Sequence, residues 1–252
     1  MTKLTFIGRM GGKYRQRTFL ADILHRQTFQ TYCEPFLGGG QVFLELNQDT
    51  NKLYVLNDNN KDIYDLWNDM RMIDPEVVRK YQFIQSRETF EGFKHQQTIN
   101  NIYKRFYRNL YLSLFSYSYN RIAFAPKYET KGQHIKNNIE KLQTKMKDVV
   151  LLNEDYKSVL KQYDSPTTIF YLDPPYVKME KYYEEQSIDP NELANICRTL
   201  QGKFILSYSN DPVVIDAFRD EKFFISEVPM TYTSGRKSKR TIEILISNFS
   251  IV

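Results

Sequence analysis

An acid, two prolines and a tyrosine stand in succession at Asp173, Pro174, Pro175 and Tyr176. Residues 169–172 before them are apolar and β-favouring, which is typical of a buried parallel strand. Two prolines remove two N–H donors and fix two φ angles, so the strand must stop and its last carbonyls are held still. A carboxylate, rigid carbonyls and an aromatic ring therefore meet at the carboxyl end of a strand, where open α/β sheets bind ligands.

This set of groups suits a planar amine. Such an amine on a heteroaromatic base is a weak nucleophile, because its lone pair is delocalised into the ring. Hydrogen bonds to Asp173 and to the Pro174 carbonyl would draw the nitrogen toward tetrahedral geometry, while Tyr176 stacks on the base. The lone pair could then attack an electrophilic methyl group. The alternative is an ordinary exit from a strand, since Pro-Pro pairs are common in loops.

The four residues resemble the catalytic motif of S-adenosylmethionine-dependent amino-methyltransferases. In those enzymes Asp at the first position is typical of DNA adenine-N6 methylation, Ser of cytosine-N4 methylation, and Asn of glutamine modification. The resemblance implies that Asp173, Pro174, Pro175 and Tyr176 are catalytic, with Asp173 also beside the cofactor. It implies S-adenosyl-L-methionine as the cofactor.

Length and composition favour one large domain, or a core with an insertion. The 252 residues include 10 Gly and 9 Pro, too few for a disordered chain. No apolar run is long enough to span a membrane, and the N-terminus lacks a secretory h-region. We expect a cytoplasmic protein, monomeric in solution and without membrane contact; the resemblance implies a prokaryotic or phage-infected cell.

The cysteines and histidines show no spacing typical of metal ligands. Cys33 and Cys197 are the only cysteines, and the three histidines are isolated from one another. We therefore expect no metal site. Both cysteines lie in apolar-periodic stretches and are expected to be buried thiols.

Positive charge is concentrated in one segment. Residues 75–148 contain fourteen Lys or Arg against six Asp or Glu, a net +8, so the rest of the chain carries −3 of the total +5. This asymmetry indicates a nucleic-acid face on a near-neutral core. A solvated helical surface is the alternative.

A glycine pair and Lys13 precede a predicted helix at residues 17–26. Glycines allow backbone N–H groups to approach an anion, and Lys13 would add a charge for a carboxylate. The spacing of a Walker loop is missing. The segment resembles the N-terminal cofactor motif of the same family, in which an aromatic residue stands where this chain has Arg9. The resemblance implies that Arg9 and Lys13 bind the cofactor.

Residues 31–46 read as a strand, a turn of three glycines and the start of a helix. This is the order of a nucleotide-binding βα unit, but the full Gly-x-Gly-x-x-Gly pattern of nicotinamide sites is absent. The turn resembles the family's S-adenosylmethionine loop, which implies cofactor contacts from Pro35, Phe36 and Gly38. A plain tight turn is the alternative.

Two acids follow the next predicted strands. Asp58 ends a strand at residues 53–58, about 20 positions after the glycine turn, where an acid can accept hydrogen bonds from ribose hydroxyls. Asp155 and Tyr156 follow a strand at 149–153, where the family has an acidic-aromatic pair lining the cofactor's adenine ring. Helix N-capping is the alternative for both acids.

From residue 74 to 147 the alternation of strands and helices disappears, and residues 101–119 are predicted to be helical. An enzyme acting on a base inside duplex DNA must extrude it, and inserted side chains can occupy the vacated stack. In the resembling family this region is the DNA-recognition insertion. The resemblance implies DNA contacts from Tyr119, Asn120, Arg121 and Lys127, with ordinary packing as the alternative.

The C-terminal part returns to alternating elements. Helices are predicted at 191–200 and 212–218 and strands at 203–209, 223–232 and 241–249, the last two as an antiparallel pair. The loop between that pair, residues 234–240, is dense in phosphate-binding groups. We expect phosphate contacts there, with a solvated hairpin tip as the alternative; the basic residues are Arg236, Lys237, Lys239 and Arg240.

Together the motifs predict an α/β fold with a doubly wound, Rossmann-like methyltransferase sheet, mostly parallel with an antiparallel last strand. Residues 1–73 and 149–252 would form the catalytic domain, and 74–148 a mainly helical DNA-recognition insertion. The motif order resembles that of the Dam-like, D12-class adenine-N6 methyltransferases, which act on double-stranded DNA. Alternatives are a cytosine-N4 or RNA amino-methyltransferase and a catalytically degenerate DNA-binding protein.

Overall fold

The computed structural model divides into two compact units. It describes residues 4–8, 13–96, 98–117, 120–125, 132–176, 188–234 and 237–251, with backbone only for 230–234 and 237–241. Unit 1 comprises residues 1–27, 37–50 and 58–153, and unit 2 comprises residues 28–36, 51–57 and 154–252. The predicted DNA-recognition insertion, residues 74–148, is defined by function and not by compactness, so its bounds stay a prediction.

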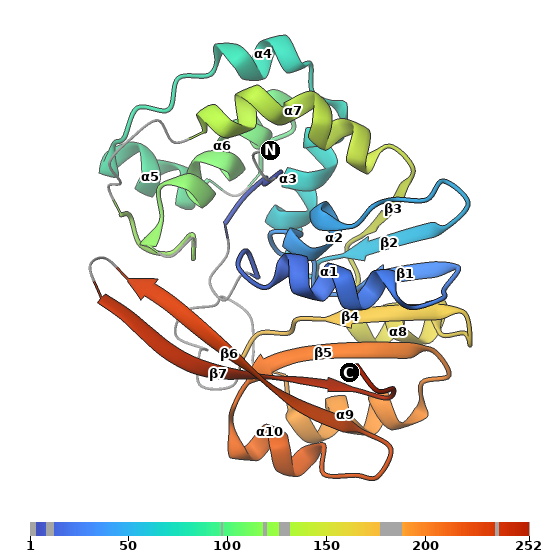
Figure 1. Ribbon diagram of the computed structural model, residues 1–252. Coiled ribbons are helices and arrows are strands. Elements are labelled where there is room, and N and C mark those ends of the chain that lie inside the picture. The colour runs from blue at the N-terminus through green and yellow to red at the C-terminus, as the bar shows by residue number, and fades with distance from the viewer. Residues whose placement is uncertain are drawn as a thin grey trace. The chain divides into compact units, whose positions relative to one another are not determined.

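Within the described residues, seven strands form one sheet in the order β3-β2-β1-β4-β5-β7-β6 (Figure 1). The pairs β1·β2, β1·β4 and β4·β5 are parallel, whereas β5·β7 and β6·β7 are antiparallel. The predicted α/β class, with a mostly parallel sheet and an antiparallel end, is therefore confirmed. The strands are β1 (Thr31–Glu34), β2 (Leu53–Asn57), β3 (Val149–Leu152), β4 (Thr168–Leu172), β5 (Lys203–Ser209), β6 (Phe224–Ser234) and β7 (Lys237–Ser247).

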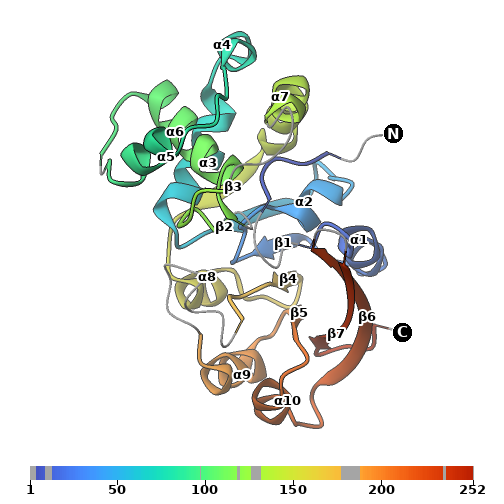
Figure 2. The same cartoon turned by 90° about the vertical axis from the view of Figure 1, so that its left-hand side faces the viewer.

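Three helices of unit 2 lie along one side of β4 and β5 (Figure 2). Asp155, Asp189 and Asp211 cap their N-termini by accepting a backbone N–H, and two of the helices have Pro in the first turn. Both features favour helix initiation. The first N–H groups of a helix have no partner within the helix, so a capping carboxylate satisfies one of them, and Pro has no N–H group that would need a partner. The helices are α8 (Tyr156–Tyr163), α9 (Pro190–Thr199) and α10 (Pro212–Ala217).

Unit 1 is mainly helical. Helix α3 packs against α6 and α7, and α4 packs against α7. Within the described part of residues 75–148 the elements are helices, as predicted, although α6 ends earlier than the predicted residue 119. The helices are α1 (Arg17–His25), α2 (Gln41–Glu45), α3 (Lys61–Met72), α4 (Pro75–Lys80), α5 (Arg87–Lys94), α6 (Ile102–Leu114) and α7 (Gln133–Met146).

The prediction of a loop over residues 234–240 is wrong for its second half. Strand β7 already begins at Lys237, and Lys237 to Arg240 pair with β6 from Ser234 back to Thr231. The opposing segment is rich in threonine and tyrosine, which favour strands. The ladder therefore continues through residues that polarity alone assigned to a loop.

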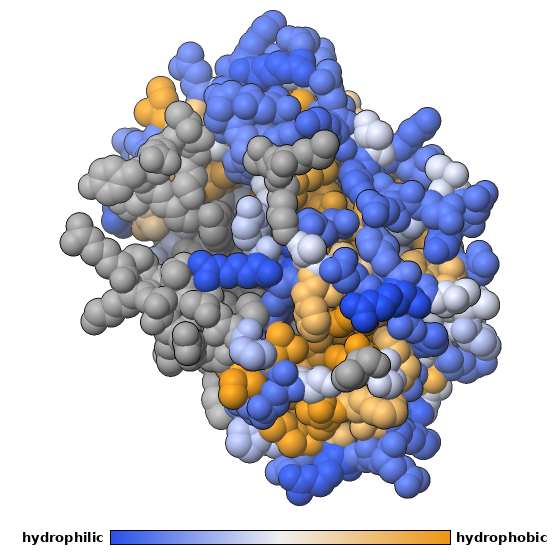
Figure 3. Space-filling model, in the orientation of Figure 1, coloured by the Kyte–Doolittle hydropathy of each residue, from blue (hydrophilic) through white to orange (hydrophobic). Residues whose placement is uncertain are grey.

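Hydrophobic residues also gather on part of the surface of the molecule, over the region where β6 and β7 run in Figure 1 (Figure 3). Ile225 of β6 and Ile242 of β7 are exposed, and the register places them on the same face of the β6·β7 ladder. Apolar atoms make up much of any folded protein's surface, so two exposed isoleucines need no special explanation.

Gly40 is a position where we expect a side chain to be poorly tolerated. It has a φ of 59°, and a Cβ built there would lie 2.8 Å from the Trp67 ring. Gly40→Ala should lower the free energy of unfolding by about 2–3 kcal/mol, from left-handed strain and overpacking. Gly92 in α5 is the matched control, because a Cβ there meets nothing within 4 Å.

Gly92→Ala should raise that free energy by roughly 0.5–1 kcal/mol, through its higher helix propensity. Urea denaturation of both variants measures the difference. Equal effects at the two positions would contradict the assigned strain.

Candidate active site

A hydrogen-bonded carboxylate holds the glycine turn. Gly38 and Gly40 adopt positive φ angles of 48° and 59°, which glycine tolerates because it lacks a Cβ. The Gly38 N–H donates to Asp58 Oδ2 at 2.7 Å, and the Gly38 carbonyl accepts from Trp67 Nε1 at 2.9 Å. Asp58 is 5% exposed and accepts from the Asn60 N–H at 2.9 Å. Two predicted cofactor residues, Gly38 and Asp58, are therefore in direct contact.

A buried arginine anchors the start of α1. The Lys13 carbonyl accepts the Arg17 N–H at 2.7 Å, and both residues are buried. Arg17 Nη1 donates to Gln41 Oε1 at 3.0 Å, and Arg17 Nε lies 3.0 Å from Glu45 Oε2. These contacts tie α1 to α2. Arg9 lies outside the described residues, so its cofactor contact stays a prediction.

Asn57, which the sequence argument missed, fixes two other predicted cofactor segments. It ends β2, is fully buried and donates to the Pro35 carbonyl at 2.9 Å. Its side chain also donates to the Glu154 carbonyl at 3.0 Å and accepts the Glu154 N–H at 2.9 Å. The sequence signal that could have identified Asn57 is an amide side chain at the end of an apolar strand, because a buried amide needs hydrogen-bond partners.

An aromatic pair lies beside these segments in unit 2. The rings of Phe36 and Tyr156 are 5.1 Å apart, so two predicted cofactor residues come together. Burial, and then the charge of Glu192, raise the pKa of Tyr156, so its phenol stays neutral. Asp155 caps α8 by accepting the Lys157 N–H at 2.8 Å. The capping alternative for Asp155 is therefore observed.

The predicted catalytic acid is held by a serine of the next strand. Strand β4 ends at Leu172, and the half-buried Asp173 follows. The Ser207 hydroxyl donates to Asp173 Oδ1 at 3.1 Å and lies 3.0 Å from the Tyr171 hydroxyl. One carboxylate oxygen is thereby fixed in orientation.

A tyrosine of the same strand holds the proline-tyrosine part of the motif. The Tyr208 hydroxyl donates to the Pro175 carbonyl at 3.1 Å. Its ring stacks on Tyr176 with centroids 4.8 Å apart and an interplanar angle of 24°. Sequence reasoning missed Ser207 and Tyr208; only the β4·β5 register, which pairs Leu172 with Leu206, reveals them.

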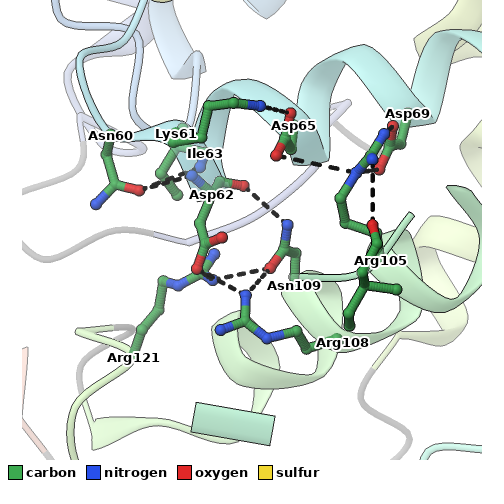
Figure 4. A network of polar contacts seen from close by, with 11 residues as sticks. Asn60, Lys61, Asp62, Ile63, Asp65, Asp69, Arg105, Arg108, Asn109 and Arg121 are labelled. Atoms are coloured by element: carbon green, nitrogen blue, oxygen red, sulfur yellow. Dashed lines mark hydrogen bonds and ion pairs between the residues drawn. The ribbon is translucent and has the colours of Figure 1, made fainter. Parts of the chain in front are cut away.

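In unit 1, Asp62 in the first turn of α3 pairs with two arginines of the predicted insertion (Figure 4). Asp62 Oδ2 accepts from Arg108 Nη1 at 2.8 Å and from Arg121 Nη2 at 2.7 Å. Asn109 Oδ1 accepts from the same two guanidinium groups, at 2.7 and 3.1 Å. Arg121 is 5% exposed and has a φ of 64°. A phosphate contact from Arg121 would require this network to open.

A second ion pair connects α3 and α6. Arg105 donates to both carboxylate oxygens of the buried Asp69, at 2.8 and 2.5 Å. Burial raises the pKa of Asp69, and the hydrogen bond from Arg105 opposes that shift. With Arg79, which pairs with Glu76 and Glu140, four arginines of the basic segment have acidic partners inside unit 1. Part of the segment's positive charge therefore has a structural role.

Only some of the other residues predicted to contact DNA lie in the part of the chain that the structure describes. Asn120 Oδ1 accepts the Ile122 N–H at 2.9 Å, which stabilises a local turn. Tyr119, Lys127 and Arg236 lie outside the described residues. The backbone of Lys237, Lys239 and Arg240 belongs to β7. DNA contact stays a prediction for all of these residues.

In the described ranges, no three His, Cys, Asp or Glu side chains gather in a way that could hold a metal ion. No helix there is long and apolar enough to cross a membrane. Cys33 and Cys197 are buried and free, as predicted. Burial raises the pKa of both thiols, to about 12 for Cys197, so neither is a reactive thiolate.

The chain is similar to several known proteins. Residues 10–233 match the model of the family described as D12 class N6 adenine-specific DNA methyltransferase. Type II methyltransferase M1.LlaDCHI of Lactococcus lactis subsp. cremoris is 23% identical over 280 residues, covering 95% of this chain and 93% of that protein.

Two solved structures show a distant likeness. Precorrin-6y C5,15-methyltransferase from Geobacter metallireducens GS-15 has a TM-score of 0.43 and 11% identity, covering 92% of this chain and 85% of that one. HI0767 from Haemophilus influenzae has a TM-score of 0.42 and 12% identity, covering 94% and 89%. The family assignment rests on the sequence match alone.

Removing the charge of Asp62 should destabilise unit 1. Asp62→Asn leaves two buried guanidinium groups without their carboxylate, which we expect to cost about 1.5–3 kcal/mol in unfolding free energy. Asp62 is 38% exposed, so solvent screens the pair and the expected loss lies in the lower part of that range. Asp216→Asn removes the same charge from a pair whose side chains are 77% and 66% exposed.

This control should change the unfolding free energy by less than about 0.5 kcal/mol. Urea denaturation measures both variants. An Asp62→Asn protein as stable as Asp216→Asn would show that the network contributes nothing.

Proposed function

Because this chain belongs to the D12 class of N6 adenine-specific DNA methyltransferases, we propose that it methylates adenine N6 in double-stranded DNA, using S-adenosylmethionine and a flipped target base. The observation that carries the proposal is the motif at the end of β4. There a strand serine orients the Asp173 carboxylate, and the Tyr176 ring is stacked on Tyr208. These are the groups that a planar amine requires.

The residues of the glycine turn fit the proposed cofactor. S-adenosylmethionine supplies an electrophilic sulfonium methyl group when bound. Asp58 is an acceptor for ribose hydroxyls, and the buried Lys13 is a cation for the carboxylate of the amino-acid tail. In unit 2 the neighbouring rings of Phe36 and Tyr156 suit an adenine ring. We assign cofactor binding to Arg9, Lys13, Pro35, Phe36, Gly38, Asp58, Asp155, Tyr156 and Asp173.

The catalytic motif would act by hydrogen bonding and stacking. Asp173 and the Pro174 carbonyl accept the two N–H bonds of the adenine amine, which directs the nitrogen lone pair away from the ring. These bonds strengthen as the nitrogen becomes tetrahedral and positive, so they stabilise the transition state more than the ground state. Tyr176 holds the base by stacking, and Pro175 fixes the loop. The methylated amine then loses its proton to a nearby acceptor.

DNA binding would use the insertion and the β6–β7 hairpin. We propose that Tyr119 and Asn120 contact the space vacated by the flipped base. Phosphate contacts would come from Lys127 and, in the hairpin, from basic residues at its tip and along the start of β7. Arg121 would support this segment through its bonds to Asp62. The hairpin residues are Arg236, Lys237, Lys239 and Arg240.

Replacing the catalytic acid tests the reaction. Asp173→Ala removes an acceptor that acts in the transition state, so methyl transfer should fall at least about 100- to 1,000-fold, while DNA affinity stays within about threefold. Labelled S-adenosylmethionine and nucleoside analysis measure N6-methyladenine, and a gel-shift titration measures DNA affinity. Asp216→Ala, an exposed acid on α10, is the control.

Comparable turnover by Asp173→Ala and the wild type would rule out the assigned role. Label recovered in cytosine or in RNA would instead redirect the substrate assignment.

A salt titration tests the hairpin. If Lys239 neutralises one phosphate, Lys239→Ala should reduce the magnitude of the slope of log affinity against log salt by about 0.9. Lys222→Ala removes an exposed lysine from the turn before β6 and should leave the slope unchanged. Equal slopes for the two variants would exclude a phosphate contact by Lys239.

A further inference from the structure

Two consecutive residues of β5 make side-chain contacts with the loop that follows β4. Ser207 donates to the Asp173 carboxylate, and Tyr208 donates to the Pro175 carbonyl and stacks on Tyr176. Every part of the predicted catalytic motif except Pro174 thus has a contact from one dipeptide. Both side chains of this dipeptide are buried.

The strand geometry explains how one dipeptide reaches two parts of the loop. Strand β5 pairs in parallel with β4 as far as Leu206 opposite Leu172, and it continues to Ser209. It therefore runs beside the segment in which prolines prevent β4 from continuing. Successive side chains of a strand point to opposite faces, so Ser207 and Tyr208 approach the loop from different sides.

The hydrogen bonds around Ser207 have one consistent direction. An ionised carboxylate can only accept, so the Ser207 hydroxyl donates its single proton to Asp173. Its oxygen then accepts from the Tyr171 hydroxyl, 3.0 Å away. Ser207 and Tyr171 are almost completely buried, so these hydrogen bonds are shielded from water. The carboxylate is thus held by a chain of two hydroxyl groups.

Tyr208 restricts the aromatic ring of the motif in a similar way. Its ring covers one face of Tyr176 at 4.8 Å, and its hydroxyl fixes the carbonyl of the residue before Tyr176. A substrate base would therefore stack on the opposite face of Tyr176. The position of that face is set by β5 and not by the loop itself.

We propose that Ser207 and Tyr208 are positioning residues for methyl transfer, acting through Asp173 and Tyr176; this rests on the proposed function. Ser207 sets the direction of the carboxylate that receives the adenine amine. Tyr208 sets the plane against which the base lies. Small displacements of reacting groups lower the rate strongly, because the attacking atom must be aligned with its target. Neither residue needs to touch the substrate for this role.

The test compares Ser207→Ala and Tyr208→Phe with Ser247→Ala. Ser247 is a matched control, since it is a buried serine of the adjacent strand β7 whose hydroxyl donates to the Phe249 carbonyl at 2.7 Å. In single-turnover assays, Ser207→Ala and Tyr208→Phe should each lower the rate of methyl transfer roughly 10- to 100-fold. KM for S-adenosylmethionine should stay within about twofold, and Ser247→Ala should react like the wild type.

A second measurement does not depend on activity. Hydrogen–deuterium exchange at the amides of Asp173 and Tyr176 should accelerate in Ser207→Ala and Tyr208→Phe but not in Ser247→Ala. Unchanged exchange, or faster exchange with an unchanged rate of transfer, would overturn the positioning role. If the variants exchange faster but the wild-type protein methylates no adenine, the proposed function would be rejected, while the contacts of Ser207 and Tyr208 with the loop would be supported.

Discussion

The end of β4 depends on one backbone constraint, which is that two consecutive prolines cannot donate to a β-ladder. Strand β4 stops at Leu172, whereas its neighbour β5 continues three residues beyond the paired Leu206. This difference in length leaves side chains of β5 beside a rigid loop. Asp173 therefore receives its hydrogen bond from another strand, and its direction is a property of the sheet.

Acidic side chains in unit 1 organise backbone and arginine groups. Asp58 accepts the N–H of Gly38 in the glycine turn, and Asn60 caps the helix that follows. Asp62, two residues later, accepts from two buried guanidinium groups. Capping and ligand binding are compatible for such residues, because a carboxylate has several acceptor sites. The structural role of Asp58 is thus compatible with its proposed cofactor role.

The basic segment shows why net charge alone overstates a nucleic-acid surface. Its count of +8 includes arginines that pair with acids of the same unit, among them Arg105 with Asp69 and Arg108 with Asp62. Asp62 and Asp69 lie outside residues 75–148 in the sequence, so the count omits them. Buried arginines need partners, and their planar guanidinium groups satisfy several acceptors at once. These pairs stabilise the packing of helices.

The sequence by itself determined the strands of the sheet, apart from their exact ends, and the motif residues, because strand breaking by proline, capping by aspartate and positive φ at glycine are local properties. It placed Asp173 at the end of a strand and Asp58 after the glycine turn correctly. Only the tertiary structure identified Asn57, Ser207 and Tyr208, and it extended β7 back to Lys237. These features depend on strand register and pairing, which bring together residues that are distant in sequence and have no local signal.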